Sequence, residues 1–314
     1  MATFGGFDCG TYPGDTEIQA WKDNSSYQFV GYYLPSPCHP GTSWAGKYQL
    51  LKNMGWGFAI LYVGQQVAGG RCSQNTLTRN QGLFDGSDAV SKCQAEGFPQ
   101  DSIVFLDVEG MDPPVPSEMV DYYRGWISSI LDSNYLKPGT YCAAKNAVDL
   151  INAAQAEYSA HGLPGGAPSF WVVKVDPLFD PLTSSPTGCG ISFADVWQGQ
   201  IDLSGETHGG VTFDIDQDAA NSSDPSRAGH LASALTREIR EDYSEVVPLN
   251  LAPARTTEIF SSVLTELAQA GGKGEPQQRL FFPNGIELLD VQVTIGIKDP
   301  GWSVKVTVAG PKKP

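Results

Sequence analysis

The sequence predicts an α/β protein, a TIM-type (β/α) barrel that lacks its late helices, followed by a small α+β unit. The first observation is that strand-like apolar segments alternate with helix-like segments over residues 3–175. The second is that acidic residues end several of these apolar segments, where a barrel carries its functional groups. The third is a change of pattern after about Tyr243.

The expected strands are short apolar runs rich in β-branched and aromatic residues. They cover Thr3–Cys9, Gln28–Leu34, Gly57–Val63, Ser102–Glu109, Gly139–Ala143, Ser169–Val175, Ser192–Gln198 and Gly210–Asp216. Because strands joined through helices run parallel, we expect a mostly parallel sheet that closes on itself.

The expected helices follow the strands and are placed by caps and by apolar periodicity. They begin at Asp15, near Trp44 (ending at Met54), near Ser87 (ending at Glu96), at Ser117, near Ala147 (ending at Ser159) and near Pro225 (ending at Glu241). Residues 176–190 contain three prolines and no helical period, and a Gly-rich loop precedes the last strand. The barrel should therefore be irregular on that side.

The last part of the chain predicts a separate unit. Thr256–Ala270 is an amphipathic pattern that ends at Gly271, and two alternating segments around Val293 and Val306 flank a Pro-Gly turn. We therefore expect a barrel over residues 1–243 and a helix-plus-hairpin accessory domain over residues 244–314. That unit could stabilise the barrel or bind a carbohydrate or another partner.

Composition excludes some partners. The chain has 314 residues and a formal net charge of −15, which argues against nucleic acid or an anionic membrane as a ligand. No apolar run approaches the roughly 20 residues of a spanning helix, so no membrane insertion is expected. The N-terminus shows no signal segment, so an extracellular or cell-wall location requires that a signal peptide was removed. The sequence is silent on oligomeric state.

The six cysteines are widely spaced and form no zinc-ligand pattern. Their even number allows disulfides in an oxidising compartment, and free thiols are equally compatible with the spacing. Asp214, Asp216 and Asp218 begin like a calcium loop, but Ala219 replaces the turn glycine and Pro225 replaces the bidentate acid. We therefore expect no metal and no other cofactor.

Acids at the ends of three expected strands form the candidate catalytic group. Asp8 ends the first strand, Asp107 and Glu109 end the fourth, and Asp214 and Asp216 end the eighth. Side chains alternate along a strand, so Asp107 and Glu109 point to the same side. Carboxylates that face each other across a cleft meet the requirement of glycoside hydrolysis for one protonated and one ionised acid. The alternative is that these acids are solvated, form ion pairs or cap a helix.

Polar aromatic residues and a glutamine end other strands. Their rings suit the apolar faces of sugars, and their polar atoms suit sugar hydroxyls. The candidate substrate-binding residues are Asp216, Tyr33, Tyr62, Tyr141, Trp171, Trp197 and Gln198. Each aromatic residue alone is also compatible with a place in the core.

Five segments in this order resemble glycoside hydrolase family 25, the lysozyme-type muramidases. They are Gly-Phe-Asp at Asp8, Asp-x-Glu at Glu109, Pro-Gly-Thr-Tyr at Tyr141, Trp-Gln at Gln198 and Phe-Asp-Ile-Asp at Asp216. Residues 4–220 resemble more closely a glycoside-hydrolase-like domain, the domain of unknown function 1906. The resemblance implies an incomplete barrel and does not reach residues 245–314.

Carried over by position, the resemblance implies that Glu109 is the general acid and Asp107 its partner, with Asp8 and Asp214 completing the charge of the subsite. Asp216 departs from the muramidase pattern, which has Asn there. The expected function is hydrolysis of a β-linked glycan such as peptidoglycan. The alternatives are an inactive glycan-binding or interaction module on the same barrel and a metal-dependent phosphodiesterase.

Overall fold

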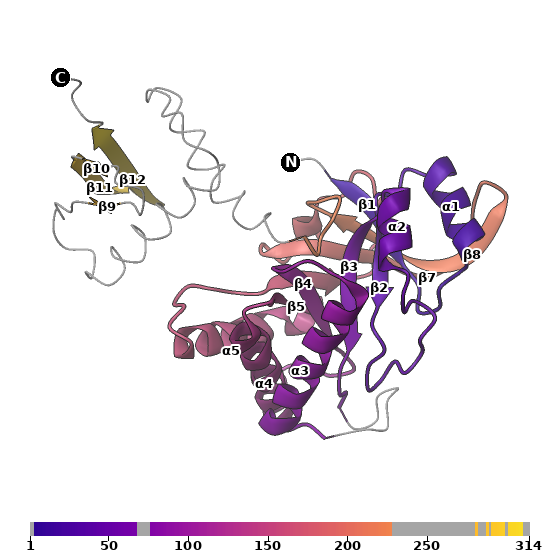
Figure 1. The fold of residues 1–314 in the computed structure, drawn as a ribbon, viewed down its shortest axis with the longest axis horizontal. Coiled ribbons are helices and arrows are strands. Elements are labelled where there is room, and N and C mark those ends of the chain that lie inside the picture. The colour runs from indigo at the N-terminus through magenta and orange to yellow at the C-terminus, as the bar shows by residue number, and fades with distance from the viewer. Residues whose placement is uncertain are drawn as a thin grey trace. The chain divides into compact units, whose positions relative to one another are not determined.

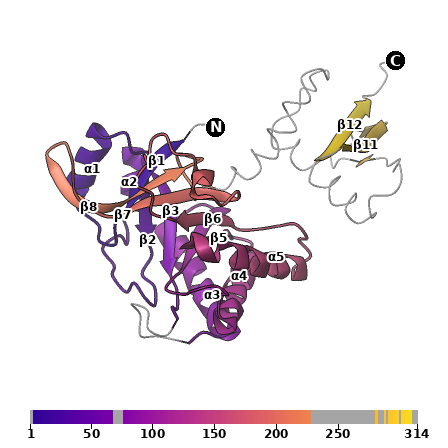
Figure 2. The same cartoon turned by 180° about the vertical axis from the view of Figure 1, so that it is seen from behind.

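The computed structural model describes residues 3–67 and 76–227 and, further along, strand segments at 280–281, 287–288, 290–298 and 301–309. The chain divides into two compact units, Met1–Asp242 and Tyr243–Pro314, which are described separately here. The first unit contains a closed barrel of eight strands with helices packed outside it (Figures 1 and 2). The predicted fold class is confirmed.

The first six strands of the barrel are parallel, and each pairs with the next along the chain. They are β1 (Phe4–Asp8), β2 (Phe29–Tyr33), β3 (Gly57–Val63), β4 (Ser102–Val108), β5 (Leu136–Ala143) and β6 (Ser169–Val173). The helices between them are α1 (Asp15–Asn24), α2 (Tyr48–Met54), α3 (Arg79–Glu96), α4 (Ser117–Ser133) and α5 (Ala147–Ala160). All six strands fall within or next to the segments that the sequence predicts.

Helix α3 begins eight residues before the expected start at Ser87. Thr78 caps it by accepting a hydrogen bond from the backbone N–H of Gln81. The sequence did not predict this first part of the helix, because Gly82 lies in it and glycine is a poor helix former. Its role is close packing: a Cβ at Gly82 would lie 2.0 Å from the carbonyl oxygen of Tyr122 on α4.

The barrel closes through two strands that are not joined to their neighbours by helices. β7 (Ala194–His208) pairs parallel to β6, and β8 (Val211–Ala220) pairs antiparallel to both β7 and β1. The expectation that the eighth strand ends at Asp216 was therefore wrong, and β8 is an antiparallel member of the mostly parallel sheet. Gly209 and Gly210, both with positive φ, make the tight turn that reverses the chain.

The late helices are missing, as predicted. Between β6 and β7 the only helical segment in the described chain is a single 3₁₀ turn, η2 (Pro186–Cys189). Residues 225–227 are not helical, and the rest of the expected helix at 225–241 lies outside the described residues. Within the ranges given above, every helix is too short or too polar to traverse a lipid bilayer.

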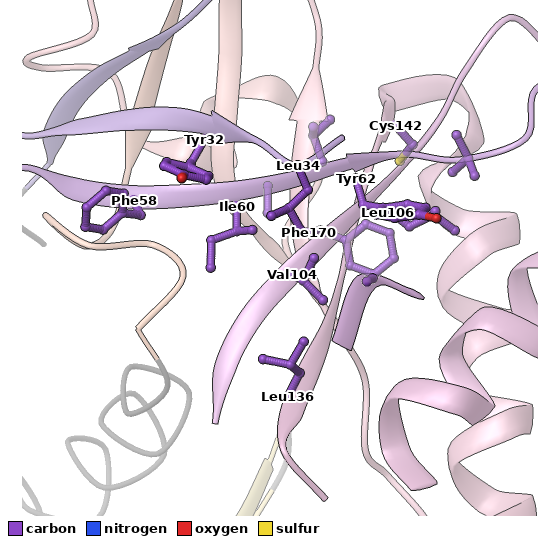
Figure 3. Packing of buried hydrophobic residues seen from close by; sticks show 14 of the residues in the cluster. Tyr32, Leu34, Phe58, Ile60, Tyr62, Val104, Leu106, Leu136, Cys142 and Phe170 are labelled. Carbon is purple, nitrogen blue, oxygen red and sulfur yellow. The ribbon is translucent and has the colours of Figure 1, made fainter. Parts of the chain in front are cut away.

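Alternation along the strands divides the core into two layers. Val104 and Leu106 of β4 belong to the larger cluster between the barrel and its helices, part of which Figure 3 shows. Ile103 and Phe105 belong to a smaller cluster inside the barrel, together with Trp171 of β6. The same alternation points Asp107 inward, above Phe105, into the carboxyl end of the barrel.

The second unit contains the hairpin that the alternating valines predict. β11 (Asp290–Lys298) pairs antiparallel with β12 (Gly301–Ala309), and Val293 lies opposite Val306. A shorter pair joins β9 (Leu280–Phe281) and β10 (Glu287–Leu288). The helix expected at 256–270 lies outside the described residues.

Candidate functional site

A cavity of about 650 Å³ opens at the end of the barrel where strands β1–β6 have their carboxyl ends. Its described lining consists of Asp8, Cys9, Gly10, Tyr33, Cys38, His39, Leu61, Val63, Gln66, Asp107, Glu109, Gly110, Tyr141, Val173, Gln198, Ile201, Asp202, Asp214, Ile215 and Asp216. This is the end of a (β/α) barrel at which function is concentrated. All the acids predicted for the site line this one cavity.

Asp107 and Glu109 form the β4 wall of the cavity. Asp107 is 7 % exposed, and its Oδ1 has no hydrogen-bond partner, whereas Glu109 is half-buried at the mouth. Burial and the charge of Glu109 raise the pKa of Asp107 well above its ordinary value. Asp107 therefore retains a proton more readily than an isolated aspartic acid.

Gln66, in the segment after β3, fixes the backbone of this wall. Its Nε2 donates to the carbonyl oxygen of Asp107 at 2.9 Å, and its Oε1 accepts from the N–H of Glu109 at 2.9 Å. The two bonds connect the segment after β3 to the end of β4. Sequence analysis did not select Gln66, because a lone glutamine in a loop carries no periodic signal.

Asp8 lies at the end of β1 and is held on both carboxylate oxygens. The Tyr33 hydroxyl donates to Oδ1 at 2.5 Å, and Gln198 Nε2 donates to Oδ2 at 2.7 Å. β2 passes very close, because a Cβ at Gly31 would lie 2.3 Å from the Cβ of Asp8. Only glycine allows the two strands to approach in this way.

The acids of β8 reach the same mouth because that strand is antiparallel. Asp216 lies directly opposite Asp8 in the β1–β8 register, and Asp214 lies further out on the exposed part of the hairpin. Asp216 Oδ1 accepts from the backbone N–H of Asp202 at 2.6 Å. Both acids thus line the cavity at the predicted end of the barrel, although they do not end their strand.

Asp218 is an additional acid below the cavity. It is fully buried, and its Oδ1 accepts from Trp171 Nε1 at 2.9 Å. Its carboxyl group lies close enough to that of Asp8 for the charge of Asp8 to raise the pKa of Asp218. The Asp-x-Asp-x-Asp spacing could have identified Asp218 as a further acid of the site, since every second residue of a strand faces the same side.

Burial and the neighbouring carboxylates control protonation at Asp8. Burial first, and then the charge of Asp216, raises the pKa of Asp8 to about 7. Burial and the charges of Asp8 and Asp216 also raise the pKa of Asp218 well above its ordinary value. Close to neutral pH, this part of the site therefore contains both protonated and ionised carboxyls.

The predicted aromatic residues are only partly brought together. Tyr33 and Tyr141 line the cavity, and the Tyr141 hydroxyl donates to Gln198 Oε1 at 2.6 Å. Trp171 is buried inside the barrel, where it packs edge to face against Tyr141 at 5.1 Å between ring centroids. It therefore supports the cavity floor and is not part of the described lining.

Two of the aromatic residues lie away from the cavity. Tyr62 is buried and donates its hydroxyl hydrogen to Asp88 on α3, and Trp197 donates from Nε1 to the carbonyl oxygen of Lys174. Alternation explains both positions, since each side chain belongs to the outward-facing layer of its strand. Their expected place in the substrate cleft was wrong.

The described residues contain no group of three or more His, Cys, Asp or Glu placed to hold a metal ion. Cys38 is disulfide-bonded, whereas Cys9, Cys93, Cys142 and Cys189 are free. His39 follows Cys38 and lies against Tyr33, with 4.8 Å between the ring centroids.

The sequence of the barrel places the chain in a class of glycoside hydrolase-like domains. Residues 19–220 match the family model described as "Rv2525c-like, glycoside hydrolase-like domain". The chain belongs to this family. No curated protein sequence matches the chain.

Solved structures with a similar fold have low sequence identity. An uncharacterized B. stearothermophilus protein is 16 % identical with a TM-score of 0.48, and the match covers 69 % of this chain and 96 % of that one. The Clostridium perfringens spore cortex lytic enzyme SleM is 13 % identical with a TM-score of 0.48 and coverages of 69 % and 67 %. The autolysin LytC from Streptococcus pneumoniae, solved with a synthetic peptidoglycan ligand, is 11 % identical with a TM-score of 0.46 and coverages of 69 % and 46 %.

Proposed function

We propose that this protein hydrolyses a β-linked glycan, such as the glycan of peptidoglycan, with Glu109 as the proton donor. One observation carries the proposal: Asp107 and Glu109 from β4 line the same cavity as Asp8 and Asp216 from the opposite side of the barrel. Glycoside hydrolysis needs two carboxyl groups with different protonation on either side of the bond to be broken. The family to which the chain belongs is consistent with this chemistry.

The two acids of β4 differ in their access to a substrate. Glu109 is half-buried at the mouth and is one methylene longer than Asp107, so it reaches a glycosidic oxygen more easily. Asp107 lies deeper in the cavity lining and has a buried Oδ1 without a hydrogen-bond partner. It is suited to accept a hydrogen bond from an N–H group of the sugar, in an acetamido or a free amino substituent, and so to orient that substituent.

The remaining lining residues would bind the sugar. Tyr33 and Tyr141 offer ring faces and hydroxyl groups, and Gln198 joins Tyr141 to Asp8. Asp8, Asp214 and Asp216 would stabilise the positive charge that develops at the anomeric carbon. We assign this activity to residues 1–243 and an accessory role to residues 244–314.

A location outside the cell suits this proposal. Disulfides persist in oxidising compartments, and Cys38 is disulfide-bonded. A cell-wall glycan would be accessible there. The proposed partner is therefore an extracellular glycan.

Glu109→Gln tests the proposal, because glutamine preserves the shape of the side chain and removes the acidic proton. We expect wild-type protein to release new reducing ends from peptidoglycan or from chitin oligomers, and Glu109→Gln to lower that rate at least about a hundredfold. Glu118→Gln, an exposed glutamate at the start of α4, is the matched control and should retain full activity.

Binding measurements separate hydrolysis from recognition. If wild-type protein binds a glycan with the same affinity as Glu109→Gln and releases no reducing ends, the protein is a binding module and the hydrolase proposal is wrong. Full activity in Glu109→Gln would equally contradict the assigned role. Activity that survives EDTA would exclude a metal-dependent reaction.

A further inference from the structure

The described lining of the cavity is rich in acidic residues. Six carboxyl groups contribute to it, from Asp8, Asp107, Glu109, Asp202, Asp214 and Asp216. Among the same described lining residues there is no lysine or arginine, and His39 is the single titratable base. Burial lowers the pKa of His39, so it adds little positive charge near neutral pH.

Asp107 provides a second and independent indication of a ligand. Asp107 lines the cavity and is only 7 % exposed. Its Oδ1 receives no hydrogen bond. A buried carboxylate oxygen without a donor is costly unless a ligand supplies one. The group that fits there is an N–H or O–H donor and not another acceptor.

Asp202 extends the negative wall outward. It lies on β7 with a φ of 53°, which is uncommon for a residue other than glycine, and its side chain is exposed. No hydrogen bond or ion pair from the described residues reaches its carboxylate, although its backbone N–H donates to Asp216. This carboxylate is therefore available to a group bound at the mouth.

We propose that the cavity selects glycans with protonated amino groups, such as oligomers of unacetylated glucosamine, over neutral and acidic glycans. This inference rests on the proposed function and adds the charge of the substrate to it. An ammonium group supplies N–H donors and is attracted by those of the six carboxyl groups that are ionised, whereas a sugar carboxylate is repelled by them. Uronic acid polymers should therefore be excluded.

Calorimetric titration of the full chain tests this selectivity with three tetrasaccharides: glucosamine, N-acetylglucosamine and galacturonic acid oligomers. At mildly acidic pH and low salt we expect the glucosamine oligomer to bind at least about tenfold more tightly than the acetylated one, and the galacturonate oligomer not to bind. High salt should reduce the preference, since it screens charges at the open mouth.

Asp202→Asn tests whether the cavity wall causes the preference for the glucosamine oligomer. Asparagine tolerates the positive φ at this position. We expect the substitution to weaken binding of the glucosamine oligomer about threefold and to weaken binding of the acetylated oligomer less. Asp101→Asn is the matched control: it also has positive φ, but it lies next to the amino end of β4 and pairs with Lys137.

The outcomes distinguish this inference from the function on which it rests. Equal affinity for the glucosamine and acetylated oligomers, or a preference that Asp202→Asn does not reduce, overturns the charge selectivity alone. Failure to bind or cleave any of the three oligomers and peptidoglycan overturns the proposed glycan function itself. Tighter binding of the galacturonate oligomer overturns the selectivity and indicates an acidic glycan instead.

Discussion

Gln198 on β7 holds Asp8 on β1 across the intervening strand, with 2.7 Å between Nε2 and Oδ2. The same amide group lies 3.2 Å from Asp216 Oδ2 and accepts from the Tyr141 hydroxyl. One buried side chain thus joins acids of β1 and β8 to an aromatic residue of β5, where the parallel and antiparallel parts of the barrel meet. The geometry of the cavity depends on this amide.

Replacing Gln198 by leucine keeps the volume of the side chain and removes its hydrogen bonds. Because the Gln198 donor lowers the pKa of Asp8, we expect that pKa to rise above about 7 in Gln198→Leu. We also expect a loss of about 1–3 kcal/mol in the free energy of unfolding, from the unsatisfied partners. NMR titration of the Asp8 carboxyl and denaturant unfolding measure the two effects.

Gln49→Leu provides the control for this substitution. Gln49 is exposed on α2 and bonds only to Asn53 in the described chain, so both quantities should stay close to their wild-type values. An unchanged Asp8 pKa in Gln198→Leu would mean that the amide does not stabilise the ionised carboxyl.

Much of the barrel could be predicted because its signals are local. Apolar runs and caps define the strands and most helices, and two-residue alternation places Asp107 and Glu109 on one side. The direction of β8 could not be predicted in this way, because two-residue alternation places Asp214 and Asp216 on one face whichever way the strand runs. It depends on the turn at Gly209 and on pairing with β1, which is distant along the sequence.

The binding residues were harder to predict than the acids. Tyr62 and Trp197 are residue types that often bind sugars, but their positions along the strands direct their side chains to the outer layer of the core. Gln66 acts through backbone groups of a distant strand, and such a contact leaves no pattern in the chain. Long-range register and loop contacts therefore limited the prediction of the site.

The raised pKa of Asp8 makes stability depend on pH. An acid whose pKa rises on folding, here from 3.8 to about 7, stabilises the folded state while it is protonated. This contribution is full below pH 3.8 and is lost as pH increases to about 7. The slope for one proton is about 1.4 kcal/mol per pH unit, and Asp107 and Asp218 act in the same direction.

Asp8→Asn isolates this effect from the rest of the molecule. We expect the wild-type free energy of unfolding to fall relative to that of Asp8→Asn as pH rises from about 4 to about 7, measured by urea unfolding at a series of pH values. The variant should also lose hydrolytic activity, because Asp8 lines the cavity. Parallel curves for the two proteins would mean that the Asp8 pKa is the same in the folded and unfolded chains.

Gln66 offers a test of how the wall of β4 is positioned. Gln66→Ala removes the bonds to the Asp107 carbonyl and the Glu109 N–H, so the end of the strand becomes free to move. We expect kcat to fall about tenfold or more with a smaller change in KM, since the sugar-binding side of the cavity is retained. Steady-state kinetics on a soluble glycan gives this comparison.

Gln66→Glu sharpens the same test. Its carboxylate still accepts from the Glu109 N–H, but it no longer donates to the Asp107 carbonyl and adds a negative charge beside the pair. We expect kcat to stay low and the acidic pair to titrate at higher pH, which shifts the pH profile upward. A profile identical to that of wild type would contradict a positioning role for Gln66.

Glu157 on α5 is a buried carboxylate that connects three helices outside the barrel. It is 1 % exposed and accepts from Arg79 of α3, with 3.0 Å between Nη1 and Oε2, and from Arg124 of α4, with 3.0 Å between Nε and Oε2. Removing one partner from a buried pair costs several kcal/mol, but both arginines are partly exposed and can be solvated. We therefore expect Glu157→Gln to lower the free energy of unfolding by about 2 kcal/mol.

Glu118→Gln on α4 controls for the change of charge, because Glu118 is exposed and forms no ion pair in the described chain. The Glu157 effect should persist at high salt, since a buried carboxylate is screened less than a surface one. Glycan cleavage at a temperature well below the unfolding midpoint should be unaffected, because Glu157 does not line the cavity. A stability loss that disappears in salt would mean that the three helices are held by packing alone.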